Sequence, residues 1–281
     1  MSARVVSVLL PMVLLLGGCS TQIFGNRQAE AQQTTDQQGA IAPYDIDVYA
    51  EVLSTYVDDD GWVNYAGLQA DRAGLDQFNA SLNTLSPEVF AEWSESERIA
   101  FLINAYNSFT LKSIIDQTPL KSSIKDIPGV WKFRRHEVLA DSMTLDHIEH
   151  GILRKEYSEP RIHAALVCGA RSCPPLRNEP YTGEQLEEQL EDQVMQWFEG
   201  PYGLEIDREN NTVSISSIFD WFGEDWKAAH TPDSGFSGSD TQKAVLNFIS
   251  AYLEEADAEY LRSGGYRVKY LNYDWSLNDQ R

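Results

Sequence analysis

The sequence predicts an α+β (or irregular α/β) fold: a single domain of mixed helices around a small sheet. Segments with helical periodicity are interspersed with short runs of alternating apolar residues, and the two kinds do not follow a regular βαβ order. The expected folded part, residues 44–281, is long for an average domain but within the range of one, and it shows no internal repeat. It also contains ample Trp, Tyr, Phe and Leu to form a core.

The chain begins with a segment typical of a secretory signal. Arg4 provides a positive start, and Val5 to Leu16 is apolar except for Ser7 and Pro11. This run is too short to span a bilayer comfortably, which favours a cleaved signal over a retained helix. The alternative is a buried apolar N-terminal helix, but a Gly-Gly pair that disfavours helix ends the run.

Leu16-Gly17-Gly18-Cys19 matches the lipobox of bacterial lipoproteins. We therefore expect residues 1–18 to be removed as a signal peptide and Cys19 to be acylated, as with palmitate. Ser20 stands where an inner-membrane retention signal would have Asp, so the expected location is the outer membrane, facing the periplasm.

Residues 19–43 are predicted to form a flexible tether between this anchor and the domain. They are rich in Gln, Ala, Thr and Gly and cannot bury enough surface to offset the entropy of ordering. The formal net charge of −21 argues against nucleic acid and against an anionic membrane surface as partners. The membrane is thus an expected partner only through the lipid on Cys19.

Turn and capping residues separate the elements predicted in the first half of the domain. We expect a helix at Asp45–Tyr56, a short strand at Trp62–Tyr65 after an Asp-Asp-Asp-Gly turn, and a helix at Ala66–Leu82. The sequence Ser94-Glu95-Ser96-Glu97 has capping-box spacing and predicts the start of a helix at Arg98–Ile115. That helix is apolar nearly all round, which is typical of a buried helix.

Periodicity also predicts the elements of the second half. Trp131–Leu139 resembles a β-ribbon, Thr144 caps a helix at Leu145–Tyr157, and Arg161–Cys168 alternates as a strand does. The remaining predicted elements are helices at Gly183–Phe198, Ile218–Trp226 and Gln242–Ala256 and strands at Thr212–Ile215 and Tyr266–Leu271.

Two cysteines remain for chemistry once Cys19 is acylated. Cys168 and Cys173 lie in Cys-Gly-Ala-Arg-Ser-Cys, in a compartment that permits disulfides. Cys168 ends a predicted strand just before a glycine-containing loop, where nucleophiles are common. Three interpretations stay open: a disulfide or inert buried thiol, a nucleophile activated by a base or a positive field, and a metal ligand.

The helix predicted after Thr144 offers partners for the thiol. Glu149 falls within the apolar stripe of this helix and His150 at its edge. A buried carboxylate needs a partner because an uncompensated buried charge is very costly. Two interpretations stay open. In the first, an arginine such as Arg154 or Arg161 forms a structural ion pair with Glu149. In the second, Glu149 or its neighbour His150 reaches the thiol of Cys168.

Other polar residues are candidate ligands or orienting groups. His163 should point to the opposite sheet face from the cysteine five residues later, so it is a poor candidate for pairing. His147 and His150 diverge on their helix and have no companion at zinc-motif spacing, so we expect no metal and no cofactor. Asn104 and Asn107 lie one turn apart; their amides either satisfy buried loop backbone, or one orients a catalytic histidine or forms an oxyanion hole.

Five motifs resemble the family called domain of unknown function 547. They are Asp60-Gly-Trp-Val-Asn-Tyr-Ala66, Asn104-Ala-Tyr-Asn107, Ile148-Glu-His-Gly-Ile-Leu-Arg154, Arg161–Leu176 and Tyr270–Asn278, and together they cover nearly the whole domain in order. The resemblance implies a fold and a set of motif residues, but no agreed activity. Asn272 stands where the family usually shows Pro, a departure confined to the final turn.

The resemblance also ranks the residues of the site. Its most characteristic positions match Asn104, Tyr106, Asn107, Glu149, His150 and Cys168 of this sequence. Cys173 matches the residue of bacterial members at this position, whereas related plant sequences have Ser there. This difference favours Cys168 as the important thiol and disfavours an essential disulfide. A thiol, a helix-borne histidine and an Asn or acid are similar to the sites of cysteine hydrolases and transglutaminase-like transferases.

The leading hypothesis is a membrane-tethered envelope lipoprotein with a thiol-dependent hydrolase or acyl-transferase site. Cys168 would be the nucleophile and His150 its base, oriented by Glu149 or Asn104. One alternative is a non-catalytic lipoprotein that binds a peptide, polysaccharide or protein through aromatic residues near Trp221, Phe222 and Trp226. Another is a redox module built on the two cysteines, although Cys-x4-Cys is not the usual redox spacing.

Overall fold

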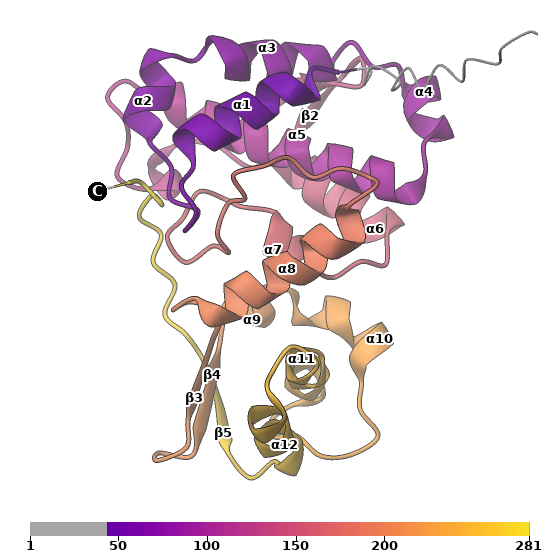
Figure 1. Cartoon of the computed structure of the whole chain (residues 1–281), viewed down its shortest axis with the longest axis vertical. Coiled ribbons are helices and arrows are strands. Elements are labelled where there is room, and N and C mark those ends of the chain that lie inside the picture. The colour runs from indigo at the N-terminus through magenta and orange to yellow at the C-terminus, as the bar shows by residue number, and fades with distance from the viewer. Residues whose placement is uncertain (1–43, 281) are drawn as a thin grey trace, which may run out of the picture. The chain divides into compact units, whose positions relative to one another are not determined.

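The computed structural model describes residues 44–280, which form an α+β body, as the sequence predicts. In Figure 1, helices α1 to α5 gather in one part of this body, and strands β3 to β5 with helices α11 and α12 in another. Helices α7 (Ile162–Ala165) and α8 (Leu186–Glu199) lie between them. The signal peptide, Cys19 and the tether lie outside the described residues and stay predictions.

The first part consists of the long helix α5 (Glu95–Ile115) and four shorter helices. The other four are α1 (Ile46–Tyr56), α2 (Tyr65–Ala70), α3 (Ala73–Leu82) and α4 (Pro87–Glu92). The predicted capping box is present, since the Ser94 side chain accepts from the Glu97 backbone and the Glu97 side chain accepts from the Ser94 backbone. From Ile99 to Ile115 every residue of α5 except Lys112 is buried, which confirms the expectation of a helix without a wet face.

Two predictions in this part are wrong. Trp62–Tyr65 is not a strand: only Val63 makes isolated bridges, and Asn64 caps α2 by accepting from the Gly67 backbone. The single helix predicted at Ala66–Leu82 is two helices, α2 and α3. Asp71 between them has ψ of 66°, outside the helical range.

The middle segment departs most from the prediction. The helix predicted at Leu145–Tyr157 is confirmed in its extent, but its middle, η2 (His147–Leu153), is a π-helix, which α6 (Arg154–Glu156) follows. Arg161–Cys168 contains the short helix α7 and is not a strand. Residues 162–167 are all buried, so their apolar pattern was a sign of complete burial and not of one covered sheet face.

Two small sheets complete the fold. β1 (Arg135–Val138) and β2 (Asp141–Thr144) form an antiparallel hairpin, so only its first strand falls in the predicted ribbon at Trp131–Leu139. The second sheet has the order β3 (Leu204–Asp207), β4 (Thr212–Ile215), β5 (Arg267–Tyr270). β3 and β4 are antiparallel, and β4 and β5 are parallel.

Between β4 and β5 the chain forms five helices, and buried residues of most of them share one apolar cluster with this second sheet. These helices are α9 (Ile218–Phe222), η3 (Gly223–Trp226), α10 (Lys227–His230), α11 (Asp240–Ser250) and α12 (Glu255–Ser263). One further short helix, η1 (Ile124–Asp126), belongs to the first part. The predicted helices at Gly183–Phe198 and Ile218–Trp226 are confirmed in outline, as are β4 and β5. The helix predicted at Gln242–Ala256 is wrong in its second half, because the chain turns before Glu255 and begins α12 there.

The last ten described residues tie the two parts together. After β5 the chain runs back toward the first part (Figure 1), where it forms isolated bridges between Ala170 and Leu277 and between Val63 and Asp279. Asn278 accepts from the Tyr65 hydroxyl at 2.7 Å, and its backbone N–H donates to the Gly169 carbonyl at 3.1 Å. This C-terminal segment therefore lies directly against the cysteine loop.

Asn104 and Asn107 satisfy buried loop backbone, the first of the two interpretations left open above. The Asn107 amide donates to the Ala165 carbonyl and accepts from the Val167 N–H, both at 2.9 Å. The Asn104 amide likewise donates to the Tyr181 carbonyl at 2.7 Å and accepts from its N–H at 2.9 Å. Each asparagine thus takes the place that a neighbouring strand would otherwise have.

We expect Asn107→Leu to lower the free energy of unfolding by about 2–4 kcal/mol, because it leaves a buried N–H and a buried carbonyl without partners. Urea unfolding measures the change. Asn272→Leu is the matched control: Asn272 is exposed, so its substitution should change stability by less than about 0.5 kcal/mol. Equal stability of the two variants would contradict the role given to Asn107.

Candidate functional site

The cysteine loop starts where the chain leaves α7. Cys168 is partly buried and Cys173 is buried. Gly169 between them has φ of +81°, and a Cβ there would lie 2.7 Å from Cδ1 of Ile114. Glycine is therefore required at this position both by the backbone conformation and by the nearness of α5.

The two thiols are in contact with each other. Their Sγ atoms are 2.6 Å apart, and both cysteines are free. The Tyr273 hydroxyl lies 3.5 Å from Cys168 Sγ and 3.2 Å from Cys173 Sγ, and the Cys168 N–H donates to Cys173 Sγ at 3.2 Å. Cys173 Sγ thus accepts from the Cys168 N–H in addition to its contact with Tyr273, which is also the shorter of the two Tyr273 contacts.

These contacts separate the two pKa values. The pKa of Cys168 is raised well above its usual value by its hydrogen bond with Cys173 and by burial. Burial also acts to raise the pKa of Cys173, but hydrogen bonds from Cys168, Tyr273 and the backbone outweigh it and lower that pKa. The hydrogen bonds around Cys173 therefore favour it as the site of a thiolate, and Cys168 needs a base to lose its proton.

Cys168 borders a cavity of about 240 Å³ with largely aromatic walls. The cavity lies where the two apolar clusters of the body meet, since Tyr106 and Leu166 belong to the first cluster and Ile218 and Phe222 to the second. Its full lining is Tyr106, Trp131, Lys132, Asp146, Glu149, His150, His163, Leu166, Cys168, Cys173, Ile218, Trp221, Phe222, Tyr273 and Trp275. The structure therefore brings Cys168, Glu149 and His150 to one cavity, as the sequence suggested.

Glu149 contacts the Tyr106 hydroxyl, and its Oε1 lies 3.9 Å from Nδ1 of His150, while Arg154 interacts with it only through its charge. Burial and the nearby Glu149 carboxylate, which is hydrogen-bonded to the Tyr106 hydroxyl, raise the pKa of Tyr106 well above its usual value. Arg154 pairs with Asp225, and Arg161 pairs with three glutamates, so neither is the ion-pair partner expected for Glu149. Tyr106 is accordingly a neutral donor at physiological pH.

His150 has its ring nitrogens directed to other groups. Its Nδ1 lies 2.9 Å from Nη1 of Arg154. Since a guanidinium only donates, Nδ1 accepts this bond and the proton of a neutral His150 is on Nε2. Nε2 lies 3.9 Å from Oδ1 of Asp146. Among the described residues, no hydrogen bond joins His150 to Cys168.

The sequence predicts that His163 is a poor partner for Cys168, and this prediction rests on a strand that the structure does not contain. Because Arg161–Cys168 is not a strand, His163 and Cys168 are not on opposite sheet faces, and both border the cavity. His163 Nε2 donates to Oδ2 of Asp225 at 2.8 Å, and the ring stacks on Phe222 with centroids 4.6 Å apart. Within the described part of the chain, Nδ1 of His163 has no hydrogen-bond partner, which leaves it free to accept a proton.

Asp225 holds His163 and Arg154 together. Arg154 donates to both of its carboxylate oxygens, at 2.7 and 2.9 Å. Burial acts to raise the pKa of Asp225, but the hydrogen bonds from His163 and Arg154 outweigh it and hold that pKa well below its usual value. The carboxylate is therefore charged and fixes the orientation of the His163 ring.

Residues 44–280 contain neither a metal-binding group of side chains nor a membrane-spanning helix. No group of three or more His, Cys, Asp or Glu side chains there could hold a metal ion. No helix in the same range is long and apolar enough to cross a membrane.

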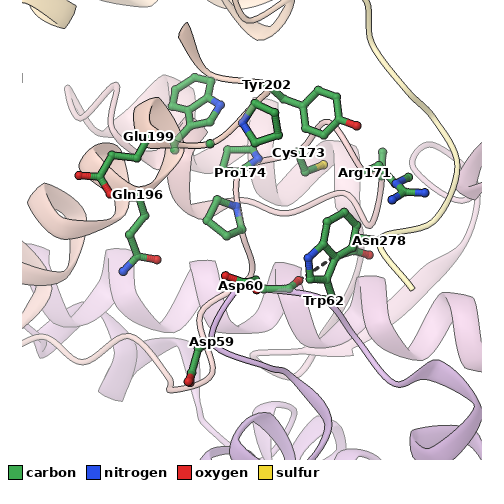
Figure 2. A pocket seen from close by; sticks show the side chains of 16 residues that line it. Asp59, Asp60, Trp62, Arg171, Cys173, Pro174, Gln196, Glu199, Tyr202 and Asn278 are labelled. Atoms are coloured by element: carbon green, nitrogen blue, oxygen red, sulfur yellow. Dashed lines mark hydrogen bonds between the residues drawn. The ribbon is translucent and has the colours of Figure 1, made fainter. Parts of the chain in front are cut away.

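A second cavity, of about 430 Å³, adjoins the cysteine loop. Of the described residues, only Cys173 borders both cavities. Figure 2 shows the Cys173 side chain between those of Pro174 and Arg171, with Tyr202 nearby. Sequence reasoning missed this cavity because its residues come from four separate stretches of the chain.

The fold and the site together define an α+β protein with a pair of contacting thiols beside an aromatic cavity. Residues 90–198 match the model of the family described as protein of unknown function, DUF547, so this part of the chain is a DUF547 domain. The match includes Asn104, Glu149, His150 and both cysteines of the loop, whereas Asp225 and Tyr273 lie beyond it. No curated protein and no solved structure matched the chain.

Replacing Asp225 by Asn should lower the free energy of unfolding by about 1–3 kcal/mol at pH 7, since charge-assisted hydrogen bonds are lost. Because the pKa of Asp225 is lower in the folded state, its stabilising effect exists above its unfolded pKa of about 4 and is lost as the pH falls further. The gap between wild type and variant should therefore narrow below about pH 4. Urea unfolding at pH 7 and pH 3 measures it, with the exposed Asp233→Asn as control. A gap that does not depend on pH would contradict this assignment.

Proposed function

We propose that this protein is a membrane-tethered envelope lipoprotein whose domain is a thiol-dependent hydrolase or acyl-transferase. The observation that supports it best is the presence of Cys168 in one cavity with two imidazoles, one of them oriented by a charged carboxylate. Cys168 is the nucleophile. Because its pKa is raised, it needs a general base to react near neutral pH.

Two histidines compete for the role of base. His150 is the residue that the sequence indicates, but its Nδ1 is occupied by Arg154. The proton of a neutral His163 is on Nε2, toward Asp225, and its Nδ1 is free. This is the arrangement in which a carboxylate sets the tautomer of a catalytic histidine, so we favour His163. In this assignment Glu149 accepts a hydrogen bond from the Tyr106 hydroxyl, and Asn104 holds the Tyr181 backbone in place.

The chemistry follows from these positions. The base takes the proton from Cys168 as the sulfur adds to an acyl carbon, and the leaving group departs with that proton. Water or an acceptor amine or hydroxyl then releases the acyl group and restores the thiol. The hydroxyls of Tyr106 and Tyr273 stay protonated, because burial raises both pKa values well above the usual range. Each would have to turn its proton away from its resting partner, Glu149 or Cys173 Sγ, to stabilise the negative oxygen.

The aromatic walls favour an apolar acyl or side-chain group as the part of the substrate held in the cavity. They also support a second candidate function, binding without catalysis. Trp221 is 44% exposed, and its ring stacks on Trp275 with centroids 5.5 Å apart. Trp226, in contrast, is fully buried and is unavailable to a ligand.

Alkylation by iodoacetamide tests the assignment of nucleophile and base. In the reduced protein at pH 7, we expect His163→Gln to slow alkylation of Cys168 by on the order of tenfold or more, as loss of a general base does. The effect should vanish at high pH, where no base is needed. Peptide mass spectrometry identifies the alkylated cysteine, and His150→Gln is the matched control.

The outcomes separate the candidates. A larger effect of His150→Gln would assign the base to His150. A Cys168 that stays unmodified in the reduced protein at every pH would end the acyl-transfer proposal and leave the binding function.

The anchor is tested by metabolic labelling with a palmitate analogue. We expect the wild-type chain to be labelled and recovered with the membrane fraction, and Cys19→Ala to lose both properties because the acylated thiol is gone. Cys173→Ala, which removes a thiol elsewhere, should remain labelled. Equal labelling of wild type and Cys19→Ala would refute the lipoprotein assignment.

A further inference from the structure

The cysteine pair is placed between two cavities. Cys168 borders the aromatic cavity, and Cys173 borders both that cavity and the larger one of about 430 Å³. The larger cavity, drawn in Figure 2, is lined by Asp59, Asp60, Gly61, Trp62, Ala170, Arg171, Cys173, Pro174, Pro175, Gln196, Trp197, Glu199, Gly200, Pro201, Tyr202 and Asn278. The acyl-transfer proposal leaves both Cys173 and this cavity without a role.

We propose that Cys168 and Cys173 form a dithiol–disulfide couple that exchanges with peptide disulfides reaching Cys173 through the larger cavity. Cys173 is the attacking sulfur, and Cys168 resolves the mixed disulfide. This inference goes beyond the proposed function and does not depend on acyl chemistry, because it needs only the two sulfurs and a path to one of them.

The contacts of the pair support this division of labour. An attacking sulfur must be a thiolate, and a thiolate is stabilised by donors around it. Cys173 Sγ has such donors in the Cys168 N–H at 3.2 Å and the Tyr273 hydroxyl at 3.2 Å. Cys168 Sγ, 2.6 Å away, is already within reach of the sulfur that it has to attack.

The surroundings of the larger cavity fit a peptide. Arg171 provides one positive charge, while Asp60 and Glu199 provide negative charges that form no ion pair with other described residues. Trp62 and Tyr202 add aromatic surface. A short peptide disulfide such as oxidised glutathione has ammonium and carboxylate groups at its ends, so charges of both signs can be matched.

The exchange balances in two steps. The Cys173 thiolate attacks one sulfur of the partner disulfide, forming a mixed disulfide and releasing the other partner sulfur as a thiolate. Cys168 then loses its proton to solvent or to that thiolate and attacks Cys173 Sγ, which expels the second partner thiolate. The partner is reduced to two thiols, and the pair is oxidised to a Cys168–Cys173 disulfide.

Oxidised glutathione, a peptide disulfide, is the probe for this reaction. The reduced full-length protein, with Cys19→Ala in every sample, wild type included, so that only Cys168 and Cys173 can react, is incubated with it and analysed by intact-mass spectrometry. We expect wild type to lose two hydrogens and to retain no adduct. Cys168→Ser should retain one glutathione on Cys173, removable by dithiothreitol, because the resolving thiol is absent.

Cys173→Ser is the matched variant, and it should form its adduct at least tenfold more slowly, because the attacking sulfur is gone. Cys168→Ala and Cys173→Ala repeat the comparison if a serine variant fails to fold, as judged by circular dichroism. Wild type that keeps two free thiols, or equal adduct rates in the two variants, would overturn the proposal. Iodoacetamide alkylation of Cys168 uses no disulfide, so each proposal can fail without the other.

Discussion

The position of the cysteine loop depends on how its buried backbone is hydrogen-bonded. No strand runs beside residues 165–173, so their N–H and carbonyl groups need partners from elsewhere. On one side the Asn107 amide bonds to Ala165 and Val167, as one residue of a neighbouring strand would. On the other side the C-terminal segment accepts from the Arg171 N–H through Ser276 and donates to the Gly169 carbonyl through Asn278. The thiols keep their geometry because both sides are held.

A second constraint joins the two apolar clusters at the site. Arg154, on α6, and Asp225, on η3, are each about three-quarters buried, and Asp225 also accepts from His163. Partly buried charges lose hydration, which only close and well-oriented partners compensate. The three groups meet this condition with hydrogen bonds of 2.7 to 2.9 Å. The same bonds that join η3 to the first part of the fold also set the orientation of an imidazole in the cavity.

Much of the fold followed from local signals in the sequence. The capping box at Ser94 and the apolar character of the following residues located α5, and alternation located β4 and β5. A segment that is buried on all sides shows no helical periodicity of apolar residues, and for this reason the sequence of α7 resembles that of a strand. The strand prediction also excluded His163 as a partner of Cys168, because it placed the two side chains on opposite faces of a sheet that does not exist at these residues. Asp225 gave no signal at all, because its role depends on a contact with Arg154, 71 residues away.

The surroundings of the pair determine what each sulfur can do. Both lie among buried aromatic rings, where a thiolate is costly, and most of the donors that reduce this cost surround Cys173. Cys168, in contrast, lines the cavity that also contains His163. A sulfur that is easily ionised therefore sits beside one that must be deprotonated by a base. In a disulfide Cys168 has no free thiol, so thiol exchange at Cys173 would decide whether Cys168 is available for acyl transfer. In this proposal a Cys168–Cys173 disulfide would couple the two cavities, and the redox conditions around the protein would set the fraction of chains that contain it.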